Sequence, residues 1–258
     1  MALKLQISQG MSDIHLKRRM CGLCVTLVMG VAAAVLPPDV YGLGQKAPRR
    51  AISSKKITRA MILEAQQRLT DLGYWTREAD GKWGEASRFG LLAFQKVEGR
   101  PRTGKLTFDE LRALRSAARP VPRQRDFAHI EVDLHRQVLF VVEANGEVSR
   151  ILPVSTGSGK PFEIEGEIEP AITPVGRFRI YRKVPGWRKS KLGLLYYPNY
   201  LVGGIAIHGN PAVPSQPASH GCIRIPMFAS EEFSGLTPIG TEVIVYNSSP
   251  NALGSVSR

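Results

Sequence analysis

The stretch I-A-I-H-G-N-P-A-V-P-S-Q-P-A-S-H-G-C-I-R-I-P, residues 205–226, brings a thiol and two imidazoles into one short segment. Cys222 is the only cysteine after an apolar stretch near the N-terminus, and His208 and His220 precede it. A thiol needs a neighbouring base, because an unperturbed cysteine with a pKa of about 8.5 is mostly protonated at pH 7. Cys222 is therefore a candidate nucleophile for acyl transfer, although a cysteine beside a histidine is also common as inert packing.

The residues that flank this segment predict β-structure. The apolar run from Leu201 to Ile207 predicts a buried strand that ends at His208, and the alternation in residues 223–225 predicts a second strand directly after Cys222. If the two strands are adjacent, the base and the thiol come together. The prolines of the connection, residues 209–218, predict a stiff loop that holds them in place.

His208 is the better candidate for the base. His220 lies two residues before Cys222, so both side chains leave the same face of an extended segment, but local geometry makes direct proton transfer between them difficult. A third group should orient the imidazole of His208. We expect the backbone carbonyl of Gly209 to do so, because no carboxylate lies nearby in the sequence.

The small residues before the cysteine fit the same chemistry. Gly221 lets the backbone approach a substrate closely, so the amides of Gly221 and Cys222 could point at a developing oxyanion. We expect Ser219 to form a hydrogen bond within this turn.

The order His-Gly, proline-rich loop and Ser-His-Gly-Cys-Ile-Arg closely resembles the signature of the YkuD-type L,D-transpeptidases, which cross-link peptidoglycan. The elements V-S-T-G at residues 154–157 and T-P-V-G at residues 173–176 recur in that family as well, so the resemblance covers residues 127–247. It implies a mainly β catalytic domain, a YkuD-like β-sandwich, that uses no metal and no other cofactor.

The resemblance also implies a role for each residue. The Cys222 thiolate attacks the carbonyl of the third residue of a tetrapeptide stem and expels the terminal D-alanine, and the amine of a second stem then attacks the thioester. His208 takes a proton from the thiol and later from the amine. His220, Gly221 and Cys222 form an oxyanion segment through their backbone amides. Arg224 stands where the family often has Arg or Asn, and the sequence leaves open whether it pairs with a stem carboxylate or is a structural strand arginine.

Further substrate contacts are expected from Ser219, Gly209 and Trp187. Trp187 belongs to residues 183–191, K-V-P-G-W-R-K-S-K, a basic turn that could form a lid over an anionic peptide. The tyrosines in residues 196–200 could line the same groove, and strand packing explains them equally well.

Two features depart from the family pattern. The loop between His208 and Ser219 is shorter than in the longer form of the motif, which leaves the shape of the groove open. Residues 163–169, E-I-E-G-E-I-E, lie between V-S-T-G and T-P-V-G and predict a solvated strand or hairpin arm, with metal binding as the alternative.

Residues 58–117 predict a small three-helix domain. Apolar residues recur at helical spacing up to a stop at Gly73 and again in residues 85–97, and Thr107 to Glu110 is a capping box for a third helix. The pattern L-x-x-L-G-Y, D-G-x-W-G, F-Q and G-x-L-T resembles the peptidoglycan-binding domain family. This likeness implies attachment to the cell wall but identifies no contact residue.

The remaining segments complete an α+β multidomain organisation in a chain of 258 residues, long enough for about two domains. Residues 1–42, with basic residues before an apolar run, predict an export signal that is cleaved or kept as an anchor, and hence a periplasmic or cell-wall protein. Residues 43–57 and 118–126 are expected linkers and 248–258 a disordered tail. In residues 127–247, Asn145-Gly146 predicts a β-hairpin.

The net charge of +13 favours an anionic partner. No nucleic-acid motif accompanies it, so peptidoglycan stem peptides and glycan are the expected partners, with membrane attachment only through an uncleaved N-terminal segment. Two rival functions remain open from the residues. A hydrolase would pass the same thioester to water, and a non-catalytic wall-binding protein would carry a Cys222 without unusual reactivity.

Overall fold

The computed structural model describes residues 56–247, so the predicted export segment, most of the first linker and the predicted tail lie outside the described residues. Three helices come first: α1 (Arg59–Asp71), α2 (Glu85–Val97) and α3 (Phe108–Ser116). Their ends follow the predicted signals, since Gly73 has φ 89° directly after α1 and the Thr107 hydroxyl accepts a hydrogen bond from the Glu110 amide. The three predicted helices are confirmed.

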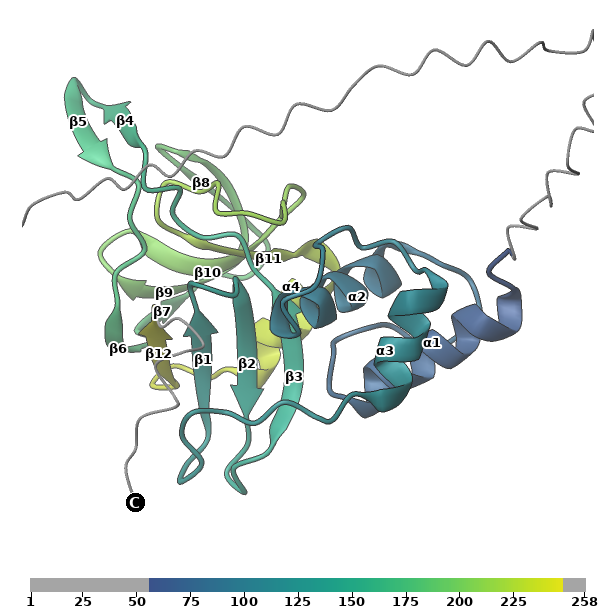
Figure 1. The fold of residues 1–258 in the computed structure, drawn as a ribbon. Helices are drawn as coiled ribbons and strands as arrows, with labels where there is room; N and C mark the ends of the chain where they lie inside the picture. The colour runs from purple at the N-terminus through teal and green to yellow at the C-terminus, as the bar shows by residue number, and fades with distance from the viewer. Residues whose placement is uncertain (1–55, 248–258) are drawn as a thin grey trace, which may run out of the picture. The chain divides into compact units, whose positions relative to one another are not determined.

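The rest of the described chain is mainly β (Figure 1). One sheet has the order β3-β2-β1-β12-β6, and a second has the order β11-β10-β9-β7 with β8 paired to β9. The strands of the first sheet are β1 (His129–Asp133), β2 (Val138–Val142), β3 (Val148–Pro153), β6 (Gly176–Arg179) and β12 (Glu242–Tyr246). Those of the second are β7 (Arg182–Lys183), β8 (Trp187–Ser190), β9 (Gly193–Val202), β10 (Ile205–Asn210) and β11 (Ile223–Pro226). The expected α+β class with a β-sandwich is confirmed.

The main core lies between the two sheets. It combines Ile130 and Val132 of β1 with Ile207 of β10 and Ile223 and Ile225 of β11, all of them buried. Side chains alternate along a strand, so the neighbours of these residues in β10 and β11 point to the other face of the second sheet. That outer face carries the candidate site.

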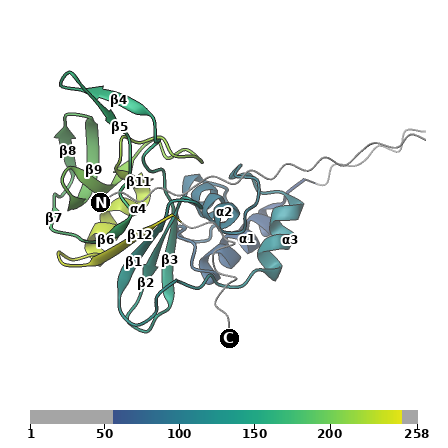
Figure 2. The ribbon, with the colours of Figure 1, turned by 60° about the vertical axis from the view of Figure 1, so that its left-hand side comes forward.

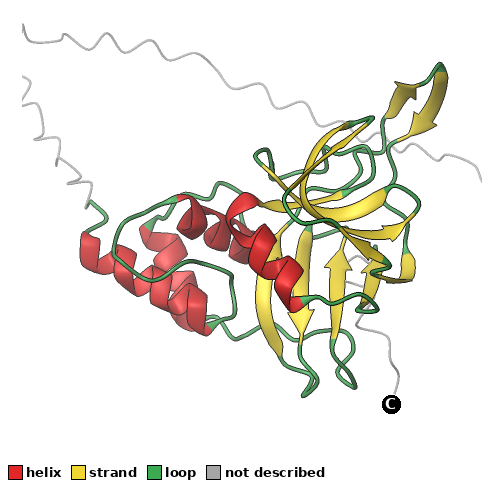
Figure 3. Ribbon diagram, turned by 180° about the vertical axis from the view of Figure 1, so that it is seen from behind, coloured by secondary structure: helices red, strands yellow, loops and turns green. Residues whose placement is uncertain are grey.

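The opposite face of the first sheet is covered by the helices (Figure 3). Phe140 of β2 and Ile151 of β3 share one apolar cluster with Leu69 of α1 and Phe94 of α2, and the Phe94 ring meets the Tyr74 ring edge-on at 5.7 Å. All five residues of β2 are buried because the strand has apolar neighbours on both sides. The helices and the first sheet therefore form one shared core.

The segment expected as a linker between helices and sheets is held against its surroundings. Arg119 donates to the carbonyls of Val148 at 2.9 Å and Asp71 at 2.6 Å. The amides of Arg123 and Gln124 donate to the two carboxylate oxygens of Glu131.

Two elements differ from the sequence-based predictions. The predicted single strand from Leu201 to Ile207 is wrong, because Gly203, with φ 53°, forms a turn with Gly204 that separates β9 from the antiparallel β10. A helix that we did not predict, α4 (Met227–Leu236), follows β11. It has no side-chain cap, and only contacts with the main core, including buried Ala229 and Phe233, account for it.

The acidic stretch forms a hairpin of β4 (Pro161–Ile164) and β5 (Glu167–Pro170) that projects from the sandwich (Figure 2). The predicted hairpin arm is confirmed, as is the hairpin at Asn145-Gly146 between β2 and β3. In the described part of the chain, no three His, Cys, Asp or Glu side chains are grouped to hold a metal ion. No helix between residues 56 and 247 has the length and apolar character needed to cross a membrane.

Because the helices and the first sheet share a core, we expect them to unfold together. Phe94→Ala should lower the free energy of unfolding by about 3–5 kcal/mol, since it removes a fully buried ring. The measurement is urea denaturation followed by circular dichroism and tryptophan fluorescence. Ile239→Ala, at a position that is 66% exposed, is the control and should change the value by less than about 0.5 kcal/mol. Two separate transitions in the wild type would contradict the shared core.

Candidate active site

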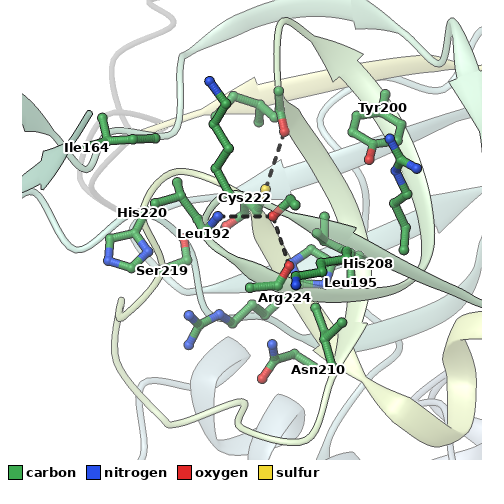
Figure 4. A pocket seen from close by; sticks show the side chains of 18 of the residues that line it. Ile164, Leu192, Leu195, Tyr200, His208, Asn210, Ser219, His220, Cys222 and Arg224 are labelled. Carbon is green, nitrogen blue, oxygen red and sulfur yellow. Dashed lines mark hydrogen bonds between the residues drawn. The ribbon is translucent and has the colours of Figure 1, made fainter.

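The parallel pairing of β10 with β11 brings the predicted base and nucleophile together. Ile207 pairs with Ile223 and His208 with Arg224, so Cys222, one residue before β11, lies beside Ala206. Ala206, His208, Cys222 and Arg224 therefore share the outer face of the second sheet. His208, Cys222 and Arg224 line a cavity of about 490 Å³, in which Cys222 lies between His208 and the Ser219–His220 pair (Figure 4).

His208 is held in one orientation by the next residue. Its Nδ1 lies 2.9 Å from the Gly209 carbonyl oxygen, which only accepts, so Nδ1 carries the proton and Nε2 keeps its lone pair. This is the hydrogen bond expected from the sequence. The side chain is 4% exposed, and this burial lowers the pKa of His208 from 6.5 to about 4. The Gly209 hydrogen bond opposes the shift, while the charge of Arg224 adds to it.

The Cys222 thiol is half-buried, with its Sγ 3.6 Å from the Gly204 carbonyl oxygen. Burial raises the pKa of Cys222, while hydrogen bonding by the Ala206 backbone and the charge of Arg224 act in the opposite direction. The resting pair at neutral pH is thus a thiol beside a neutral imidazole. An imidazole in that form is ready to accept a proton.

The turn before Cys222 is held by the side chain of Ser219. The Ser219 hydroxyl accepts from the Gly221 amide at 3.0 Å and donates to the Cys222 carbonyl at 2.6 Å, which is the expected hydrogen bonding within the turn. Gly221 has φ +136°, and a Cβ atom there would lie 2.9 Å from the Ile172 carbonyl oxygen and 2.7 Å from Ile205 Cδ1. The turn therefore requires glycine at this position.

The V-S-T-G and T-P-V-G elements hold the same turn from the outside. Ser155 and Arg224 exchange backbone hydrogen bonds, and the Thr156 carbonyl accepts from the amides of both Ala218 and Ser219 at 2.9 Å. Thr173 donates its hydroxyl to the Gly221 carbonyl at 2.6 Å. We did not name Ser155, Thr156 or Thr173 as site residues. The motifs containing them were the available signal, but only the fold shows that they contact the turn.

His220 is exposed and packs against Phe162 of β4, with 4.6 Å between ring centroids. The acidic hairpin therefore reaches the wall of the cavity, to which it contributes Phe162, Ile164 and Glu169. Because His220 is exposed, His208 is the buried imidazole of the cavity.

Of the expected substrate contacts, Arg224 and Ser219 line the cavity, and Gly209 acts through its carbonyl on His208. Trp187 does not line it, because its ring lies against Tyr196, 4.9 Å between centroids, while the next residues of β8 face the cavity. Among the tyrosines, Tyr200 lines the cavity.

The cavity wall is strongly basic. Its charged side chains are Arg182, Arg188, Lys189, Lys191 and Arg224 against one carboxylate, Glu169. Within the described residues no carboxylate pairs with Arg224, whose guanidinium therefore remains able to bind an anionic group. An anionic peptide fits this wall.

The chain resembles two known families in succession. Residues 128–245 match the family described as YkuD, L,D-transpeptidase catalytic domain, and residues 58–114 match a family of peptidoglycan binding domains. A crystal structure of an L,D-transpeptidase from Xylanimonas cellulosilytica is 38% identical, with a TM-score of 0.68, and the alignment covers 75% of this chain and 96% of that one. One from Stackebrandtia nassauensis is 25% identical, with a TM-score of 0.43 and coverage of 73% and 91%. A comparison with curated protein sequences gives no match.

The burial of His208 generates a prediction about its titration. We expect its imidazole to protonate with a midpoint near pH 4, because the folded protein disfavours the charged form. The loss of protons as pH rises should thus be complete well below pH 6.5. The measurement is an NMR titration of the ring nitrogens, with His208→Gln to assign the signal. A midpoint at or above 6.5 would contradict a buried, neutral His208.

Proposed function

Because the chain belongs to the YkuD family of L,D-transpeptidases, we propose that it cross-links peptidoglycan stem peptides through a thioester on Cys222. One observation carries the proposal: His208 on β10 and Cys222, directly before the parallel strand β11, line the same basic cavity. The transfer takes place outside the cytoplasm, where peptidoglycan is assembled. Residues 1–42 act as the export segment in this proposal, and the periplasm or the cell wall is the destination.

The first half-reaction forms the thioester. His208 Nε2 takes the thiol proton as Sγ attacks the carbonyl carbon of the third stem residue. The amide of Cys222 faces the resulting oxyanion, and the amide of Gly221 joins it by exchanging the neutral Ser219 hydroxyl for the charged oxygen. Collapse of this intermediate breaks the peptide bond, and the imidazolium of His208 gives its proton to the departing D-alanine amine.

The second half-reaction uses the same groups in reverse. The side-chain amine of a second stem attacks the thioester carbon and passes a proton to His208, and the expelled sulfur recovers that proton as the thiol. A buried base that prefers to be neutral favours both proton returns. Neither half-reaction requires a metal or a redox step.

Substrate binding relies on the basic wall. We assign Arg224 to a stem carboxylate, which a guanidinium can hold through two parallel hydrogen bonds. The helices, residues 58–117 with their family likeness to peptidoglycan binding domains, hold the enzyme on the wall polymer.

The nucleophile is tested by mixing the protein with a disaccharide tetrapeptide and following intact mass and products. The wild type should show a thioester adduct, D-alanine release and a cross-linked dimer. Cys222→Ala should lose these by about 10³-fold or more, and His208→Ala by about 10²-fold. Free tripeptide as the only product would support a hydrolase. A folded, reduced protein that gives neither adduct nor product would contradict the proposal.

The carboxylate role of Arg224 predicts a defect in binding. Arg224→Ala should raise KM for the tetrapeptide by about ten-fold, because it removes a charge-assisted hydrogen bond to the substrate. Arg112→Ala, an exposed arginine on α3, is the control for lost positive charge. Steady-state D-alanine release gives both constants, and unchanged kinetics in Arg224→Ala would leave this arginine a structural strand residue.

A further inference from the structure

Lys96 near the end of α2 has no part in the chemistry above, yet its side chain is buried, at 1% exposure, between the helices and the sheets. Its Nζ donates to two backbone carbonyls of the catalytic domain, Val154 at 2.8 Å and Gln137 at 3.1 Å. Burial lowers the pKa of Lys96 to about 7, and the charge of Arg102 adds to this effect. A neutral amine has two N–H groups, which match the two carbonyls. Burying an amine is costly, and packing alone is served by an apolar side chain of the same length.

Gln137 continues the contact toward the active site. It is 1% exposed and has φ 62°, a backbone conformation that residues other than glycine rarely adopt. Its side-chain amide forms two hydrogen bonds with Thr156. The Oε1 atom accepts from the Thr156 amide at 3.0 Å, and the Nε2 atom donates to the Thr156 hydroxyl at 2.7 Å. The backbone carbonyl of Gln137 accepts from the Val154 amide as well as from Lys96 Nζ. The two residues whose carbonyls accept from Lys96, Gln137 and Val154, are therefore hydrogen-bonded to each other, and Gln137 is also hydrogen-bonded to Thr156.

Thr156 connects Gln137 to the turn that carries Cys222. Its carbonyl accepts from the amides of Ala218 and Ser219, and the Ser219 hydroxyl bonds both Gly221 and Cys222. A continuous series of hydrogen bonds thus runs from the helical segment to the catalytic turn.

Helix α2 and the residues after it also contact the proline-rich loop between β10 and β11, and these contacts do not involve Lys96. Val213, in the proline-rich loop, is buried against Phe89 and Leu92 of α2. Arg102, which follows that helix, donates to the Ser215 carbonyl at 3.3 Å. The loop that joins His208 to Cys222 is therefore supported by the helices at an apolar and at a polar point.

We propose that the wall-binding helices are a working part of the active site, with Lys96 as a positioning residue that fixes the Cys222 turn through Gln137 and Thr156. The proposal rests on the assignment of Cys222 as the nucleophile. Lys96 touches no substrate. It determines where the sulfur and the oxyanion amides stand, and a displacement of about 1 Å in such groups can cost about 10²-fold in rate.

The test compares Lys96→Met with Lys105→Met, which makes the same replacement at an exposed lysine of the same segment. Four quantities are measured for each full-length variant: kcat and KM of D-alanine release, the rate of Cys222 alkylation by iodoacetamide, and Tm. At a temperature well below its Tm, Lys96→Met should lower kcat by about ten-fold or more at nearly unchanged KM, and it should change the alkylation rate. Lys105→Met should behave as the wild type.

Thr156→Val is a second variant that tests the same series of hydrogen bonds if Lys96→Met does not fold. It keeps the shape of the side chain and removes the acceptor of the Gln137 amide, so it should lower kcat in the same way. A lower Tm with unchanged kcat and alkylation rate would overturn the positioning role and leave Lys96 a packing residue. A wild type that releases no D-alanine would refute the proposed function instead, and the alkylation rates of the variants would still decide whether Lys96 positions the turn.

Discussion

The parallel pairing of β10 with β11 is the constraint on which the site depends. Parallel neighbours cannot be joined by a tight turn, so the chain must leave the sheet after Asn210 and return at Ile223, directly after Cys222, through a long connection. In this connection Ser219 forms one parallel bridge with Gly157, and several other backbone groups form hydrogen bonds with Ser155, Thr156 and Thr173. The short motifs shared with the family are in this sense the supports of one crossover loop.

Burial sets the resting protonation states of His208 and Cys222. A neutral imidazole and a protonated thiol avoid two charges in a poorly solvated site, and in the proposed reaction the proton moves as the sulfur attacks a substrate carbonyl. The thiolate is the form that oxidants attack. A cysteine kept as a thiol is therefore suited to an oxidising compartment, where a preformed thiolate would be lost.

The sequence was informative wherever structure depends on neighbouring residues. The cap at Thr107, the stop at Gly73 and the hairpin at Asn145-Gly146 each follow from a few adjacent side chains, and the motif around Cys222 and His208 names two residues that the fold brings to one cavity. It failed where distant contacts decide. Helix α4 owes its place to the core it covers, Leu201–Ile207 contains a turn because two glycines outweigh an apolar run, and Trp187 turns to Tyr196 and not to the cavity. The grip of Gln137 on Thr156 joins residues whose proximity no local pattern encodes.

The two-sided burial of β2 has a consequence for the ancestry of such chains. Phe140 faces the helices while Leu139 faces the other sheet, so neither surface of the strand was shaped for water. A recombination event that replaced the helical segment with an unrelated one would leave a bare apolar sheet and a molecule prone to aggregate. The two segments match separate sequence families, but because they share a core, substitutions on one side are constrained by what the other side accommodates.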